Sequence, residues 1–94
     1  MKDIDIKLLS ILKQFLNEEI DFKELDSFWI DYYIDEPDDF YYDDLFSEIS
    51  EFIYMGQKAY PSIEESKDGI IGQIELKIKI EAELIKHPEL KEYR

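Results

Sequence analysis

The chain contains no cysteine, which excludes disulfides, thiol catalysis and thiolate metal sites. Its three glycines, Gly56, Gly69 and Gly72, do not match the spacing of a phosphate-binding loop. No apolar run approaches the roughly 18 residues needed to span a bilayer. The N-terminal stretch MKDIDIKLLS lacks the continuous apolar segment of a secretion signal. We therefore expect a cytoplasmic protein that makes no membrane contact.

Basic residues are almost missing from one third of the chain. Residues 17–51 hold fourteen Asp and Glu and one base, Lys23, for a net charge of −13, whereas the remainder holds ten acids and ten bases. A field of this sign repels the phosphates of nucleic acid. We therefore expect no direct nucleic acid binding and favour a cationic protein partner.

The size and composition indicate a compact fold. Disordered acidic chains are poor in rings, but this chain of 94 residues is 45% hydrophobic and 15% aromatic. A chain this short cannot build two independent cores. We predict a single acidic helical domain over residues 1–94.

Apolar spacing predicts three helices in the first 56 residues. The first covers Asp3 to Leu16, with Asp3 as its N-cap. The second opens with a capping box in which Asp21 is followed three residues later by Glu24, and it runs to about residues 33–35, where Pro37 ends it. The third begins between residues 39 and 43 and runs to residue 54 or 55. Gly56 is its expected stop.

The last element is open to two interpretations. Residues 74–81 alternate apolar and polar side chains, as a half-buried strand does, but the run from Ile74 to Lys86 has a normal helix length. We favour a helix with two apolar stripes. The buried stripe is expected to consist of Ile71, Ile74, Ile78, Ala82 and Ile85, and the second stripe, Leu76, Ile80 and Leu84, is left for a long loop or a partner to cover. The predicted fold is all-α, a small four-helix bundle. The alternative is an α+β fold in which residues 74–81 form a strand.

The carboxylates of the acidic third fall into two aligned edges. At 100° per residue, Glu24, Asp31 and Asp35 share one flank of the second helix, and Asp44, Glu48 and Glu51 share the outer face of the third. The acidic turn around Pro37 joins the edges. We expect a partner to contact these edges, the turn and the adjacent tyrosines: Glu24, Asp31, Asp35, Glu36, Asp38, Asp39, Tyr41, Tyr42, Asp43, Asp44, Glu48 and Glu51.

No catalytic or metal-binding pattern stands out. Residues 35–44 lack the residue order of an EF-hand, and His87, before Pro88, is better explained as a residue at a helix end. A domain this small has little volume for a substrate cleft. We expect neither an enzyme nor a bound metal or cofactor.

Single-sign charge costs stability through self-repulsion, which indicates a use. We infer that the carboxylates meet Lys and Arg on a nucleic acid binding surface of another protein, where phosphates otherwise bind, with nearby rings as anchors. The chain would act as a monomer or a weak homodimer. The alternative is an acidic interaction module or regulator of another basic, nucleic acid binding protein.

The apolar spacing also resembles a known family. The segments are residues 11–20 (ILKQFLNEEI), Phe22 with Leu25, Phe28 and Trp29, residues 44–52 and residues 74–80, and they look like the colicin D immunity protein type over about residues 8–84. The resemblance implies a helical bundle that binds the basic toxic domain of a tRNA-cleaving bacteriocin or contact-dependent toxin, and so neutralises it. Residues 66–74 are also similar to the last helix of DNase-colicin immunity proteins, but the Tyr-Tyr pairs lie earlier here than in that group.

Overall fold

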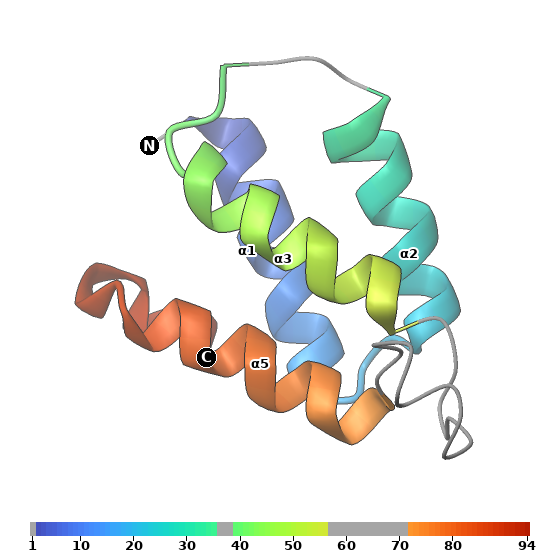
Figure 1. Cartoon of the computed structure of the whole chain (residues 1–94). Coiled ribbons are helices and arrows are strands. Elements are labelled where there is room, and N and C mark those ends of the chain that lie inside the picture. The colour runs from blue at the N-terminus through green and yellow to red at the C-terminus, as the bar shows by residue number, and fades with distance from the viewer. Residues whose placement is uncertain (1, 36–38, 57–71) are drawn as a thin grey trace.

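The computed structural model describes residues 2–35, 39–56 and 72–94. These residues contain helices and no strand, so the all-α prediction is confirmed and the strand alternative for residues 74–81 is wrong. The elements are α1 (Asp3–Leu16), α2 (Phe22–Trp29), the π-helix η1 (Ile30–Ile34), α3 (Asp43–Met55), α5 (Gln73–Ile85) and the 3₁₀-helix η2 (Pro88–Tyr93). Helix α1 packs against α2, η1, α5 and η2, while α3 packs against α5 (Figure 1).

The start of α1 is held by a buried carboxylate. The cap position is Lys2, not Asp3 as predicted. Asp5 is fully buried, and its two oxygens accept hydrogen bonds from the backbone N–H groups of Lys2 at 3.1 Å and Tyr42 at 3.0 Å. A buried carboxylate needs such donors, and it also complements the helix dipole. Asp5 thereby ties the beginning of α1 to the beginning of α3.

The turn between α1 and α2 combines two capping motifs. The N–H of Glu19 donates to the carbonyl of Gln14 at 2.8 Å and that of Glu18 donates to Phe15 at 3.1 Å, the Schellman pattern that closes a helix. The predicted capping box then opens α2. The N–H of Glu24 donates to the Asp21 carboxylate at 2.8 Å, and the N–H of Asp21 donates to the Glu24 carboxylate at 3.3 Å.

The second helix changes its winding at Ile30. It continues to Ile34 as predicted, but as a π-helix, with the N–H of Asp35 donating to the carbonyl of Ile30 at 2.8 Å. A helix closed by i→i+5 bonds turns less per residue than an α-helix. The 100° spacing used to align Glu24, Asp31 and Asp35 therefore does not hold beyond Trp29.

Helix α3 ends at a glycine that is required by space. As predicted, α3 begins at Asp43, ends at Met55 and is followed by Gly56. The φ of Gly56 is −85°, so left-handed geometry is not the reason for glycine. A β-carbon there would lie 2.9 Å from Cδ2 of Leu76 and 3.4 Å from Cε2 of Phe22. Glycine thus lets α5 and α2 approach the end of α3.

Helix α5 is confirmed, but the predicted orientation of its two apolar stripes is wrong. Leu76, Ile80 and Leu84 are fully buried, whereas Ile74, Ile78 and Ile85 are exposed. Ala82, which was predicted to be buried with these isoleucines, is exposed as well, and Ile71 lies outside the described residues.

Two lysines flank the buried stripe. Lys77 Nζ lies 5.3 Å from the ring centroid of Phe15 on α1, and Lys79 Nζ lies 5.4 Å from that of Phe52 on α3. Each lysine can lay its aliphatic stem along the core and keep its ammonium in water. This arrangement is compatible with burial of the stripe between the two stems against α1 and α3.

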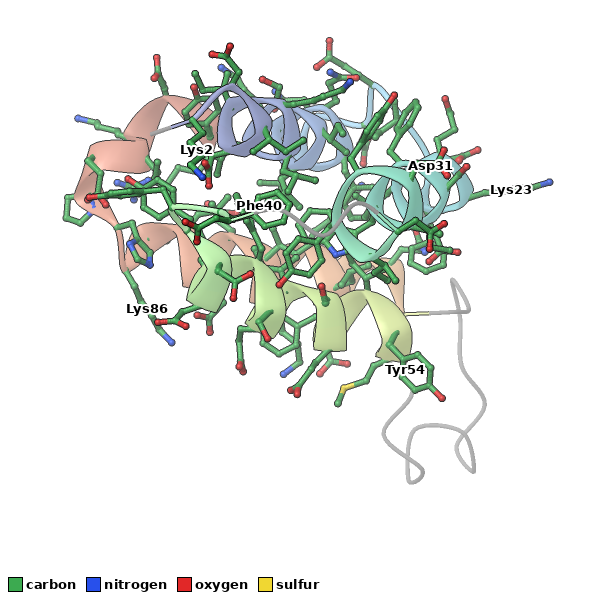
Figure 2. All side chains as sticks on the ribbon, turned by 90° about the horizontal axis from the view of Figure 1, so that it is seen from above. Lys2, Lys23, Asp31, Phe40, Tyr54 and Lys86 are labelled. Carbon is green, nitrogen blue, oxygen red and sulfur yellow. The ribbon has the colours of Figure 1, made fainter. Side chains whose placement is uncertain are left out.

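The helices share one core rich in aromatic rings. Trp29 is buried, and its Nε1 donates to Ser50 Oγ at 2.7 Å, which in turn donates to the carbonyl of Phe46 at 2.9 Å. Phe40 lies between the helices (Figure 2), with its ring centroid 5.0 Å from Tyr33 and 5.8 Å from Phe46. These contacts join η1 to α3 across the chain segment that links them.

Candidate protein-binding surface

The outer face of α3 carries the clearest acidic edge. Asp44, Glu48 and Glu51 are all exposed, while Leu45 and Ile49, on the opposite side of the helix, are buried. This is the arrangement that their i, i+4, i+7 spacing predicts. Three carboxylates therefore face solvent along one rigid helix.

Two aromatic rings flank this edge, and one of them was not predicted. Tyr41 precedes α3 and is 69% exposed, and Tyr54 near its end is 75% exposed. Tyr54 projects away from the body of the protein (Figure 2). The helical spacing places Tyr54 eleven residues after Asp43, on the same side of α3, so the sequence did contain the signal. Exposed tyrosines beside carboxylates suit protein recognition.

Tyr42, by contrast, was predicted to contact the partner but belongs to the core. It is buried, and its hydroxyl donates to Glu89 at 3.1 Å. Burial, assisted by this hydrogen bond, raises the pKa of Tyr42 to about 12. Its ring is not available to a partner, because Asp5 and Glu89 both hold the residue inside.

Asp43 has a fixed orientation at the first turn of α3. Its carboxylate accepts a hydrogen bond from the hydroxyl of Tyr33 at 3.0 Å. Burial is the main reason that the pKa of Tyr33 rises to about 12, and this hydrogen bond adds to it. Tyr33 thus stays neutral and keeps donating at physiological pH. Asp43 remains exposed and can accept a further donor.

One acid of the second predicted edge lies apart from the first edge. Glu24, Asp31 and Asp35 are exposed, but Glu24 caps α2 and lines a separate depression at the turn between α1 and α2, beside Glu18 and Lys77. Glu24 is therefore not brought together with the acids of α3, and the role of Asp31 and Asp35 stays a prediction.

The acidic turn is described only in part. Glu36, Pro37 and Asp38 lie outside the described residues. Asp39 is exposed, and its carboxylate forms an ion pair with Lys2 at 3.7 Å. The role proposed for this turn stays a prediction, and the α3 edge is the best-defined part of the surface.

A depression of about 490 Å³ lies where α3 begins, lined by Tyr41, Asp44 and His87 among others. The His87 Nδ1 is 3.4 Å from the Glu89 carboxylate, which also accepts the Tyr42 hydroxyl. Hydrogen bonding, first from its own backbone and then from its two neighbours, lowers the pKa of Glu89 against the opposing effect of burial. His87 directly follows α5 and its cap residue, as expected of a helix-end residue. The cluster joins η2 to the start of α3.

A second hollow, between α2–η1 and α3, is mostly apolar. It measures about 340 Å³ and has Trp29 and Ile53 in its lining, with Ile30, Ile34 and Tyr54 as exposed members. Sequence reasoning did not find this groove, because its walls come from two segments, α2–η1 and α3, that are distant in the chain. Its remaining lining residues are Phe22, Asp26 and Ser50.

Within residues 2–35, 39–56 and 72–94, no cluster of three or more His, Asp or Glu side chains is arranged to hold a metal ion. None of the helices in these ranges has the length and apolar character needed to cross a membrane. No family model, no curated protein and no solved structure matches this chain.

Proposed function

We propose that this chain is an immunity protein that binds and neutralises a basic nuclease toxin of the tRNA-cleaving kind. The observation that carries the proposal is the segregation of charge, with a net −13 within residues 17–51 and zero elsewhere. The exposed acidic edge of α3 gives this charge a rigid support. The resemblance to the colicin D immunity protein type adds the toxin to the proposal.

The acidic edge would cover the toxin surface that otherwise binds RNA. Carboxylates on successive turns of α3 meet Lys and Arg side chains, and the first-turn acids Asp43 and Asp44 are also stabilised by the helix dipole. Opposite charge raises the association rate, and exposed rings such as Tyr41 and Tyr54 slow dissociation. The complex would form in the cytoplasm, with the chain as a monomer or a weak homodimer and no catalytic role.

The second candidate is an acidic interaction module that regulates another basic, nucleic acid binding protein. The same charge segregation supports it, and only the identity of the partner differs. The gene next to this one separates the two candidates, because an immunity gene directly follows its toxin gene. The encoded neighbour then supplies the toxin domain for the experiment.

The test is coexpression of the chain with that toxin domain, followed by gel filtration. We expect restored growth and a stoichiometric complex. The variant Asp44→Asn/Glu48→Gln/Glu51→Gln should bind about three- to a hundredfold more weakly at low salt, since surface charge pairs contribute roughly 0.2–1 kcal/mol each. Its affinity should also depend less on salt.

A matched control removes the same charge elsewhere. The variant Glu75→Gln/Glu81→Gln/Glu92→Gln changes three exposed acids on α5 and η2 and should keep the affinity within about threefold, because these positions lie off the α3 edge. Equal loss in both variants would show that only net charge matters. Full toxicity and no complex with the unchanged chain would refute the proposed function.

A further inference from the structure

The groove between α2–η1 and α3 places apolar side chains in water beside acids. Ile34 is 59% exposed and Tyr54 is 75% exposed, and they stand on opposite walls of the same hollow. The floor includes the buried ring of Trp29, fixed by its hydrogen bond to Ser50. A floor held in one geometry beneath exposed apolar walls is suited to receive an apolar side chain.

Among the residues that the structure describes, the charged side chains that line this groove and the hollow beside it are both acids. Asp26 is part of its lining, and Glu51 lies beside Tyr54 on α3, where both line an adjoining hollow. Lys23, the single base of residues 17–51, points away from the protein (Figure 2). An occupant must therefore offer an apolar group together with positive charge. A second copy of this chain, with a net charge of −13, would be repelled.

The π-helix contributes to the shape of the groove. Ile30 and Ile34, at the two ends of η1, both line the same hollow. Two exposed isoleucines on one wall and a tyrosine on the other match the helix-in-groove mode, in which side chains at i and i+4 of a partner helix anchor it.

We propose that this groove binds a Lys- and Arg-rich amphipathic helix of the partner through one or two aliphatic side chains. The basic residues beside those anchors would pair with Asp26 and Glu51, and the apolar side chains would lie over Trp29. The choice of a basic partner rests on the proposed function. The groove itself would add anchoring that the α3 edge does not provide, since its volume of about 340 Å³ suits side chains and not a folded domain.

The test uses two synthetic peptides of equal positive charge with the unmodified full chain. One is an amphipathic helix with leucines at i and i+4, and the other has serines in their place. The single tryptophan of the chain is in the groove, so its fluorescence reports binding directly, and calorimetry gives the affinity. We expect the leucine peptide to bind about ten- to a hundredfold more tightly, as burial of one or two aliphatic side chains allows.

Variants assign this difference to the groove. Ile34→Ser/Tyr54→Ser should abolish the preference for leucine, and both sites are exposed enough to leave the fold intact. The control Ile74→Ser/Ile78→Ser alters two side chains of similar exposure on α5, outside this groove, and should retain it. Circular dichroism confirms that both variants are folded.

The outcomes separate this inference from the proposed function. Equal affinity for both peptides, no binding of either, or a preference that survives in Ile34→Ser/Tyr54→Ser would overturn the groove proposal and leave the acidic edge of α3 as the sole contact. Preference for the leucine peptide without any binding of the neighbouring toxin domain would uphold the groove and refute the immunity role.

Discussion

At the scale of single residues, Glu18 holds a backbone conformation that suits glycine. Its φ is +61°, in the left-handed region, at the position of the Schellman motif where glycine is usual. A residue with a β-carbon pays roughly 1–2 kcal/mol for this conformation. The carboxylate of Glu18 forms an exposed ion pair with Lys77 at 3.2 Å, which stabilises the fold by about 1 kcal/mol at most.

We predict that Glu18→Gly stabilises the fold by on the order of 1 kcal/mol, because the relief of strain exceeds the lost ion pair. For a chain of this length that corresponds to a rise in Tm of about 4–8 °C. Thermal unfolding followed by circular dichroism measures it. Glu18→Ala is the control, since it loses the ion pair and keeps the strain. A glycine variant no more stable than the alanine variant would contradict the explanation.

Tyr42 gives the fold a pH dependence in alkali. Its pKa is raised from 10.0 to about 12 in the folded state. Below pH 10 the hydroxyl is neutral in both states. Between pH 10 and 12 the unfolded chain loses the proton while the folded chain keeps it, so stability falls as the pH rises, by up to about 1.4 kcal/mol per pH unit for this residue.

The variant Tyr42→Phe should therefore show a flatter loss of stability between pH 10 and 12. At neutral pH it should be less stable by about 1 kcal/mol, because the hydrogen bond to Glu89 is lost. Urea unfolding at several pH values gives both quantities. Tyr41→Phe, which removes a hydroxyl from an exposed ring, is the control, and an unchanged slope for Tyr42→Phe would be evidence against the assignment.

At the scale of elements, local signals predicted the helices well. The capping box of Asp21 and Glu24 involves residues three apart, so the sequence contains all of it. The link from Asp5 to Tyr42 spans 37 residues, and no local pattern predicts such a contact. The π-helix was missed for a similar reason, since packing of Trp29 and Tyr33 against α3 involves distant residues.

Helix α5 shows most clearly what local sequence patterns cannot predict. Both of its apolar stripes have helical spacing, and only the positions of α1 and α3 decide which is buried. We predict that Ile80→Ala costs about 2–5 kcal/mol through cavity formation. Ile78→Ala should change stability by no more than about 0.5 kcal/mol, because Ile78 is exposed. Both variants replace isoleucine with alanine, so the difference between their free energies of unfolding in urea reports which of the two positions is buried. A larger loss of stability for Ile78→Ala than for Ile80→Ala would show that α5 buries the opposite stripe.

At the scale of the whole molecule, negative charge is segregated to one part of the chain, but exposed apolar surface is not. The acidic helices α2 and α3 enclose the groove, while α5 with Lys86 carries three acids and three bases and exposes its own isoleucines. The order of the residues shows the sign of the charge and where it lies along the chain. It does not show that Glu24 lies at the turn between α1 and α2, apart from the α3 edge, because that depends on how the helices pack.

The same segregation makes stability depend on salt. Repulsion among the carboxylates of residues 17–51 opposes folding, and it is screened as the Debye length falls from about 30 Å at 0.01 M to about 3 Å at 1 M salt. We therefore predict that Tm rises by several degrees, roughly 1 kcal/mol in free energy, from low to high NaCl. Differential scanning calorimetry measures this directly.

The variant Glu48→Gln/Glu51→Gln should be more stable than the unchanged chain at low salt, and its Tm should rise less with NaCl, because part of the repulsion is already gone. Glu75→Gln/Glu81→Gln on α5 is the matched control. Acids and bases are equal in number on α5 with Lys86. The loss of two acids there should therefore leave the Tm at low salt unchanged or reduce it. A fall in Tm with NaCl, or equal behaviour of the two variants, would show that the acidic edge of α3 imposes no cost on folding. Without that cost, the argument that its charge is maintained for a partner loses its physical basis.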